Sequence, residues 1–487
     1  MLHFSFVPGR FATGLALASV FLALAGCVSM GAQTPSARLN ADAAANSSRT
    51  IGSLSTELAP WPAEDWWRAY GDPQLDRLVE RARAASPGVA QALARVRQAL
   101  ALEGQAAAAL APQAGAALRS ARQRYSENGT VPKPLAGSWQ WVNDASVSLA
   151  YEVDFWGRNG AAVAAAAGQV NARRAEARAA SLAVSSAVVQ AYLRLDHLHA
   201  RRDLAEQELG QRSRILELVR QRVSAGLDSK AELKLAEIGV PAARGQVAAL
   251  DEAIALTRGQ IAALAGQGQD AADAIARPRL RRERPAGAPA AVPANIPAAL
   301  LGRRADLVAL RWQVEAASGE VDVARARFYP TVNLSVSGGL ASLGFERLLH
   351  GASHGVVAGP LVTLPLLDGS RLRAELAARS AEFDIAVERY NAAVIEALRD
   401  VTAQLTSLRW LGERVREQEQ ALGAAREARA LAEQRYSAGL GNLVPVLIAE
   451  TEVVAQSRAG AELQARANEL EVELVRALGG GYQAGQN

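Results

Sequence analysis

Two very long segments without proline constrain this chain more than any other feature. Residues 158–240 and 371–444 contain no proline, and each leads to a Ser-Ala-Gly-Leu motif after about 65 residues. A continuous helix of that length extends about 100 Å at 1.5 Å per residue. No globular core built from 487 residues could cover such helices along their whole length. The sequence therefore predicts long helices that pack mainly against one another.

The second segment carries a heptad pattern of apolar residues. A seam with a period of 3.5 residues is typical of coiled-coil packing. In each Ser-Ala-Gly-Leu motif we expect the glycine to adopt the left-handed conformation that ends a helix, so that the chain turns back. Gly226 and Gly439 then mark two hairpin tips at the same end. The seam is formed by Val387, Val394, Val401, Leu408, Val415 and Leu422, with Leu398 and Leu405 between them.

The chain is internally duplicated. Gln221–Leu227 returns as Gln434–Leu440, an offset of 213 residues, and the same offset pairs Gly266 with Gly479. Each half reads as a helix, a proline, two short strands, a very long helix, the tip motif and a further helix. The predicted organisation is a first repeat over 61–266, a linker rich in Pro, Ala, Gly and Arg over 267–300, a second repeat over 301–481 and a tail over 482–487.

Short segments between the helices have the alternation of strands. Thr331–Ser337 and Ser146–Asp154 place apolar and polar side chains on opposite faces, and the repeat predicts two further strands near 113–125 and 355–367. Alternation over about ten residues is typical of a strand in an outer-membrane barrel. Four strands cannot close a barrel, so the open edges must pair with other copies of the chain. Three copies supply twelve strands, which predicts a trimer.

The N-terminal segment resembles the export signal of a bacterial lipoprotein. Residues 11–25 are apolar but too short for a transmembrane helix, and they end in Leu24-Ala25-Gly26-Cys27. This resemblance to a lipobox implies a signal peptide over 1–26, cleavage before Cys27 and acylation of its thiol and amino group. Val28 follows in place of the aspartate that favours retention at the inner membrane, so we expect outer-membrane sorting. Residues 27–60 then form a lipidated tether.

The composition excludes several classes of function. All but three of the 53 basic residues are arginines, and they are spread among 49 acidic residues without the basic patch that nucleic acids require. Cys27 is the only cysteine, and His197 and His199 do not share a helix face, so we expect no metal site. No P-loop, HExxH, GxSxG or GxGxxG motif lies in a suitable context. We therefore expect no catalytic residue, and no cofactor apart from lipid on Cys27.

Together these features resemble the outer-membrane efflux proteins, in their lipoprotein branch. The segment Trp66–Leu75 (WWRAYGDPQL) looks like the opening of that branch. The resemblance implies a mainly α fold with a small β part: a TolC-like homotrimer with an α-helical barrel across the periplasm. Four strands from each protomer would complete a twelve-stranded barrel in the outer-membrane lipid. The implied function is a passive exit duct for drugs or toxic small molecules, supplied by an inner-membrane transporter through a periplasmic adaptor.

The resemblance also implies roles for residues at the tips. Tyr436 matches a locking tyrosine and Glu232 falls where its acidic partner would lie. Where relatives carry gate aspartates, this chain has Pro445 and Ile448, so we hypothesise an apolar constriction at Leu447 and Ile448 instead. The residues expected to dock adaptor hairpins are Arg222, Ser224, Ala225, Gly226 and Leu227 at one tip and Arg435, Ser437, Ala438, Gly439 and Leu440 at the other.

Three alternatives remain at this point. The duct could serve a type I protein secretion system, although the lipobox favours small-molecule efflux. A periplasmic adaptor lipoprotein would carry one helical hairpin within β-rich domains, whereas this chain has two hairpins and a duplication. An enzyme would need one of the missing motifs. The sequence does not specify the substrates or whether the transporter is of the resistance-nodulation, major-facilitator or ATP-driven class.

Overall fold

The computed structural model describes residues 29–30, 34–39, 51, 57–281, 291–293 and 296–484. The predicted signal peptide and Cys27 lie outside these residues. The chain forms two compact units. Unit 1 comprises the chain up to Arg38 together with Arg97–Asn171 and Arg311–Arg389, and unit 2 comprises Leu39–Val96, Ala172–Leu310 and Tyr390–Asn487. Both sequence repeats contribute to both units.

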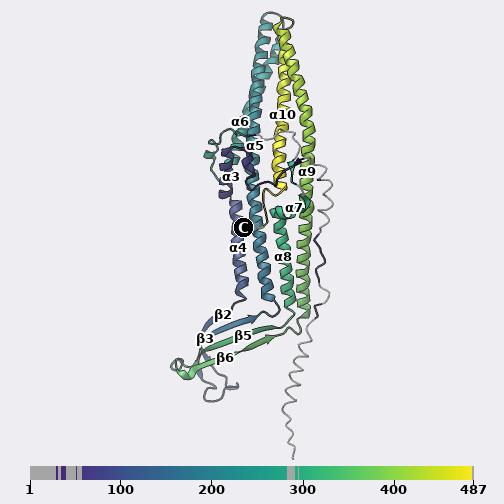
Figure 1. Ribbon diagram of the computed structural model, residues 1–487. Coiled ribbons are helices and arrows are strands. Elements are labelled where there is room, and N and C mark those ends of the chain that lie inside the picture. The colour runs from purple at the N-terminus through teal and green to yellow at the C-terminus, as the bar shows by residue number, and fades with distance from the viewer. Residues whose placement is uncertain are drawn as a thin grey trace, which may run out of the picture. The chain divides into compact units, whose positions relative to one another are not determined.

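Helices make up most of the described chain (Figure 1). Within the described residues, no helix combines the length and apolar character needed to cross a membrane. The helices are α3 (Pro73–Ala85), α4 (Pro87–Ala108), α5 (Arg158–Ser224), α6 (Lys230–Leu264), α7 (Ile296–Arg303), α8 (Ala305–Ala326), α9 (Gly369–Ser437) and α10 (Val444–Ala477), with short 3-10 turns η1 (Trp66–Tyr70), η2 (Gln269–Ala271) and η3 (Gly351–Ser353).

The two predicted long helices are confirmed. Helix α5 has 67 residues and helix α9 has 69, and neither is interrupted. The heptad seam of α9 is the buried side of the helix: Val387, Val394, Val401 and Leu405 are each at most 3% exposed. Leu408 and Leu422, at the same spacing, are half-buried. The apolar period therefore identified the side of α9 that packs against the neighbouring helices.

Unit 1 contains the predicted four-stranded sheet. Its order is β2 (Gln113–Arg124), β3 (Trp139–Val153), β5 (Thr331–Leu343) and β6 (His354–Thr363), and every neighbouring pair is antiparallel. The two strands assigned only from the repeat are therefore confirmed. Strands β3 and β5 are longer than their alternating cores suggested, because β3 already begins at Trp139 and β5 continues to Leu343.

The register of the sheet puts most of its large apolar side chains on one face, although Val357 and Leu361 of β6 lie on the other. Val147 lies opposite Ala116 and Gly338, and Leu149 lies opposite Val336, so each pair points the same way. This face is uncovered in the described chain, and its large members are between 45% and 77% exposed. They are Leu118, Val147, Leu149, Leu334, Val336, Val356 and Val362. An exposed apolar face of this kind requires a lipid or protein partner.

Small residues bring helices of unit 1 close together. The Cα of Gly168 in α5 lies against Ala316 of α8, where an added Cβ would be 3.1 Å from the Ala316 backbone. Gly319 lies in the same way against Ala165, with only 2.9 Å between an added Cβ and the alanine Cβ. The abundance of alanine and glycine in this chain thus permits close helix packing in unit 1.

Unit 2 contains Trp66–Leu75, the segment that resembles the opening of the lipoprotein branch. Trp66 and Trp67 are buried in a core shared by α3, α5 and α6. Gly71 has a positive φ of 65° and lets Asp72 cap α3, where Asp72 accepts the Gln74 N–H at 2.9 Å. Short strands β1 (Glu57–Leu58) and β4 (Ala291–Val292) pair in parallel in the same unit.

The first part of the predicted linker is fixed to α3. Asp72 accepts hydrogen bonds from the Tyr192 hydroxyl at 2.6 Å and from the Arg279 N–H at 2.8 Å, and Gln74 accepts the Ala276 N–H at 3.0 Å. Burial raises the pKa of Asp72, but these hydrogen bonds outweigh it and hold the pKa below its ordinary value. The segment after α6 is therefore a packed connection, with Ile275 in the core.

We predict that Gly319→Ala destabilises the protein. The added methyl group would overlap Ala165 and the Ala161 carbonyl, so α5 and α8 must separate, at a cost of about 1–3 kcal/mol. The midpoint of thermal unfolding, followed by circular dichroism in detergent, should fall. Gly423→Ala is the matched control, because nothing lies within 4 Å of a Cβ there and alanine favours the helix. An unchanged midpoint for Gly319→Ala would contradict the close approach.

Candidate functional site

The two hairpin tips have the same backbone geometry. Gly226 and Gly439 both adopt a φ of +73°, as the motif predicted. The Leu227 N–H donates to the Arg222 carbonyl at 2.8 Å, and the Leu440 N–H donates to the Arg435 carbonyl at 2.9 Å. This is the bond that closes a helix ending in a left-handed glycine.

The small residues of each motif line the turn and leave one leucine uncovered. The Ser224 and Ser437 hydroxyls donate to the carbonyls of Gln221 and Gln434, three residues earlier. Ala225 and Ala438 add no bulk at these turns. Leu227 and Leu440 are 68% and 71% exposed, so each tip presents an apolar side chain beside a compact backbone turn. Both tips belong to unit 2, where they lie at one end (Figure 1).

The tips differ in the state of their arginines. At the first tip the Arg222 guanidinium donates to both oxygens of Asp228, at 2.7 and 2.9 Å. This ion pair holds the pKa of Asp228 below its ordinary value. The offset of 213 places Gly441 opposite Asp228 in the second repeat. No ion pair to Arg435 is found among the described residues, so its charge is available at the second tip.

The lock between Glu232 and Tyr436 that the resemblance implies stays a prediction, and Glu232 has a local partner in this structure. The Glu232 carboxylate accepts the Ser229 N–H at 2.6 Å, which makes it the second half of a capping box at the start of α6. Tyr436 is 45% exposed, and no hydrogen bond joins it to Glu232 in the described structure. The carboxylate of Glu232, for which the resemblance implies a lock with Tyr436, therefore caps the start of α6 in this structure.

The two candidate gate residues have different surroundings. Leu447 is 4% exposed and packs inside its own protomer, whereas Ile448 is 65% exposed on the first turns of α10. Pro445 occupies the opening turn of that helix, where its missing N–H costs nothing. Of the predicted pair, only Ile448 has a side chain free to line a passage.

Ion pairs join the two hairpins along their helices, away from the tips. Glu450 of α10 is 12% exposed on its side chain and lies 3.3 Å from Arg214 of α5 and 3.9 Å from Arg429 of α9. Glu208 of α5 accepts from Arg458 of α10 at 2.6 Å. These partly buried pairs connect helices from different repeats. No sequence pattern indicates these pairs, because each partner is one charged residue among many on a long helix.

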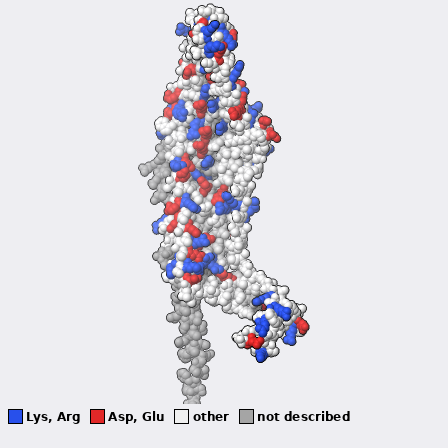
Figure 2. Space-filling model, turned by 180° about the vertical axis from the view of Figure 1, so that it is seen from behind, with Lys and Arg blue, Asp and Glu red and all other residues white. Residues whose placement is uncertain are grey.

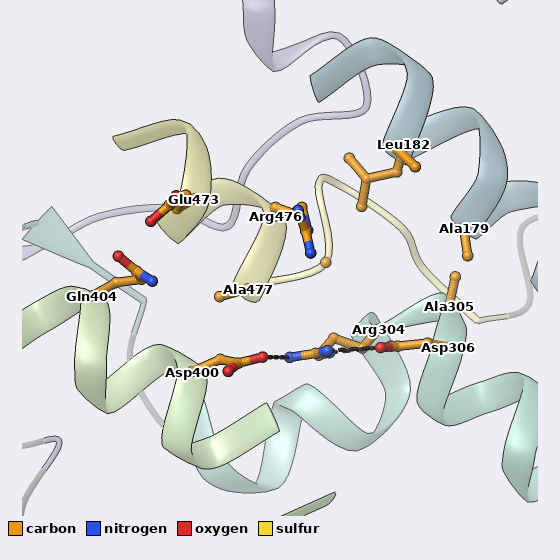
Figure 3. A pocket seen from close by; sticks show the side chains of 12 residues that line it. Ala179, Leu182, Arg304, Ala305, Asp306, Asp400, Gln404, Glu473, Arg476 and Ala477 are labelled. Carbon is orange, nitrogen blue, oxygen red and sulfur yellow. Dashed lines mark hydrogen bonds and ion pairs between the residues drawn. The ribbon is translucent and has the colours of Figure 1, made fainter. Parts of the chain in front are cut away.

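A charged pocket of about 330 Å³ lies in unit 2 where α8 begins (Figure 3). Arg304 donates to Asp306 at 3.1 and 2.7 Å and lies 3.8 Å from Asp400 of α9. Burial raises the pKa of Asp306, yet its hydrogen bonds from Arg304 lower the pKa overall. Gln404 and Glu473 line the opposite side. Arg304 thus joins the start of α8 to α9. Among the described residues, no cluster of acids, histidines or cysteines is suited to bind a metal ion.

Charges of both signs are interspersed along the helices on one face of the described chain. On the face shown in Figure 2, basic and acidic side chains alternate along the helices, whereas the sheet between the helices and its far loops is mostly uncharged.

Comparison with known proteins shows the family. The sequence profile of the family described as Outer membrane efflux protein matches residues 78–267 and 296–480. The chain belongs to this family. The bounds of the two matched segments lie close to the bounds of the two sequence repeats. Members of the family are membrane channels rather than enzymes.

Relatives of this chain are efflux proteins. It is 41% identical over 371 residues to a fusaric acid resistance protein of Burkholderia cepacia, covering 75% of this chain and 69% of that protein. It is 33% identical over 440 residues to a multidrug resistance outer membrane protein of Escherichia coli, covering 87% and 88%. These similarities support the interpretation of this chain as an outer-membrane efflux channel.

Solved structures show the same fold. The outer membrane protein VceC of Vibrio cholerae matches with a TM-score of 0.79 and 33% identity over 87% of this chain and 100% of that chain. The CmeC outer membrane channel of Campylobacter jejuni matches with a TM-score of 0.81 over 93% of this chain and 96% of that chain. At 18% identity, CmeC supports the fold alone.

We predict that Asp228→Asn loosens the first tip. The neutral amide loses the paired charge–charge hydrogen bonds to Arg222, so the turn opens more often. Hydrogen exchange measured by mass spectrometry should become faster in peptides that span residues 222–232. Gly441→Asp is the matched test at the second tip, where a new partner for Arg435 should slow exchange. Equal exchange at the first tip in the wild type and Asp228→Asn would contradict a stabilising ion pair.

Proposed function

We propose that three copies of this chain form the exit duct of a tripartite efflux pump in the outer membrane. The observation that carries the proposal is the four-stranded sheet of unit 1. Strands β2 and β6 each pair on one side only in the described chain. Backbone groups within a lipid bilayer must all be hydrogen-bonded, which requires a closed sheet. Joining β2 of one copy to β6 of the next gives twelve strands and leaves no open edge.

The exposed face of the sheet supports a membrane location for this part. Its apolar residues point away from the polar face, as they do in barrels that span a bilayer. Aromatic side chains lie at both ends of the strands. Trp156 stacks on Tyr329 with centroids 4.5 Å apart at one end, and Trp141 lies 5.3 Å from Phe345 at the other. Tryptophan and tyrosine favour the membrane–water interface.

The hairpin tips are the proposed docking site for a periplasmic adaptor. Each combines an exposed leucine with small residues at a tight turn, which lets a partner helix approach closely. The unpaired charge of Arg435 favours an acidic or carbonyl-rich partner at the second tip. Energy for transport would come from an inner-membrane transporter, because no nucleotide-binding motif occurs in the chain.

The proposed cargo is a toxic small molecule. Relatives are named for fusaric acid resistance, for multidrug resistance and for pyoverdine export, and these small-molecule cargoes support efflux over protein secretion. The proposed lipid on Cys27 would add an anchor to the barrel. A myristoyl-length chain alone binds membranes only reversibly, so several chains together with the barrel give a stable attachment.

Drug sensitivity tests the function and the docking site together. Deletion of the gene should raise sensitivity to several unrelated toxic compounds, and a plasmid copy should restore resistance. Leu440→Asp should fail to restore it, because a buried charge at the tip would prevent docking. Leu349→Asp is the matched control, since Leu349 is 84% exposed in a loop at the far end of the sheet. Leu349→Asp should restore resistance fully.

Two results would contradict these proposals. Full resistance with Leu440→Asp would exclude the tip as the docking site. Loss of protein secretion, without any change in drug sensitivity on deletion, would favour the protein-secretion alternative. A heat-modifiable trimer in the outer-membrane fraction should be present for both variants, so that a failure of transport is separated from a failure of assembly.

We predict that Ile448→Ala raises the conductance of the closed channel. Ile448 is exposed near the tip, at a position where the family resemblance implies a gate aspartate, so its truncation should widen an apolar constriction. Single-channel recording in a planar bilayer measures this directly. Leu256→Ala is the control, because Leu256 is similarly exposed at 67% but lies far along α6. Unchanged closed-state conductance for Ile448→Ala would place the constriction elsewhere.

A further inference from the structure

The N-terminal strap, defined as Ser29, Met30 and Thr34–Leu39, is attached to helix α9. Its strongest contact is with one carboxylate, that of Asp384. The Ser36 N–H donates to both carboxylate oxygens of Asp384, at 2.9 and 3.2 Å, and the Ser36 hydroxyl donates at 2.7 Å. The Ala37 N–H donates at 2.9 Å. Two successive backbone amides and a hydroxyl thus converge on a side chain almost 350 residues away in sequence.

This arrangement is specific to an ionised carboxylate at Asp384. Hydrogen bonds from the Ala37 amide and the Ser36 hydroxyl hold the pKa of Asp384 below its ordinary value. A charged acceptor that binds several donors forms stronger bonds than neutral groups do. A flexible tether without a preferred path would not place three donors of one segment around a single residue.

Two further contacts continue the attachment toward the start of the strap. The Arg373 guanidinium donates to the Ser29 carbonyl at 3.2 Å. Met30 packs against the apolar cluster of unit 1 that contains Phe328, Leu372 and Leu376, alongside Phe383. Ser29 therefore lies near Arg373 and Ser36 near Asp384, so the strap runs parallel to α9.

The length of the strap agrees with this path. Arg373 and Asp384 are 11 residues apart on α9, which is about 16 Å at 1.5 Å per residue. Seven residues separate Ser29 from Ser36 and can span up to about 24 Å when extended. Cys27 precedes Ser29 by two residues in the sequence.

The start of α9 lies at a distinct end of the sheet. Strand β6 ends at Thr363, opposite Thr331 at the start of β5, and Val332 faces Val153 at the end of β3. Large apolar side chains follow these strand ends and are uncovered. Phe155 is 68% exposed, Trp156 50%, Leu366 63% and Leu367 98%. We call these four residues the rim; they have the composition of a membrane interface.

We propose that Asp384 and Arg373 form a docking site for the N-terminal strap, which places the lipid on Cys27 in the bilayer at the rim. The strap thereby aligns two membrane attachments of the same unit, the acyl chains and the sheet. Asp384 acts as a positioning residue. The inference rests on the proposed function for the lipid itself, whereas the docking of the strap stands on the contacts alone.

Limited proteolysis tests the docking. Trypsin cleaves after Arg38, and a protease must take several residues on each side into its active site, so a strap held at Ser36 and Ala37 is protected. Loss of one charge-assisted bond corresponds to about tenfold in the docked population. In the purified full-length trimer, Asp384→Ala and Ser36→Pro should therefore each be cleaved after Arg38 at least about tenfold faster than the wild type.

The two variants remove the contact from opposite sides. Asp384→Ala keeps α9 intact because alanine favours helices, and Ser36→Pro leaves α9 unaltered. Glu382→Ala is the matched control, since Glu382 is an exposed acid on the same helix that pairs with Arg379 instead. It should be cleaved at the wild-type rate. Equal rates for all four proteins would overturn the docking site.

A second measurement tests the positioning of the lipid. In a pulse-chase experiment, Asp384→Ala should form the heat-modifiable outer-membrane trimer several-fold more slowly than Glu382→Ala, because its acyl chains are no longer held at the rim. Equal assembly rates would overturn the positioning role. Mass spectrometry of the N-terminal peptide separates the two proposals. An unmodified Cys27 would refute the lipid anchor, while the protease comparison would still decide whether the strap docks.

Discussion

The requirement that every backbone group in a sheet be paired determines how this chain can function. The backbone groups of the four antiparallel strands pair with one another inside the sheet, but those on the outer sides of β2 and β6 have no partner strand in the described chain. The same sheet exposes an apolar face with side chains such as Val147 and Val356. Both features are costly in water for a single copy. Assembly of several copies in a bilayer removes both at once, which is why membership of a channel family and the local chemistry of the sheet agree.

The helices satisfy a different requirement, because long helices with no globular core can bury apolar groups only against one another. The seam of α9 provides this through residues such as Val401, while small residues allow close approach elsewhere, as at Gly319 and Ala165. Ion pairs such as Arg458–Glu208 then fix neighbouring helices in register. Large aromatic residues are concentrated instead in the core around Trp67 and at the ends of the strands, where the chain leaves the regular helical packing.

Periodic features of the fold were predictable from the sequence, and isolated long-range contacts were not. The heptads located the long helices, the alternation located the strands, and the repeated motif located Gly226 and Gly439. The contacts of Asp72 with Arg279 and of Asp384 with Ser36 join single residues to distant backbone, and no spacing along the chain reveals them. The capping contact of Glu232 with Ser229 is local, yet it was also missed, because Glu232 was interpreted through its position in the family rather than through the helix start beside it.

The duplication explains why two tips with one backbone geometry differ in chemistry. A left-handed glycine and small neighbours are required at each turn, so both copies retain them. The residues after the turn are free to diverge: Asp228 corresponds to Gly441, and Glu232 to Pro445. One tip is consequently closed by its own ion pair and capping box, while at the other Arg435 has no ion pair with any residue that the structure describes. A partner that meets both tips therefore encounters similar shapes with different charge, so its two contacts need not be equivalent.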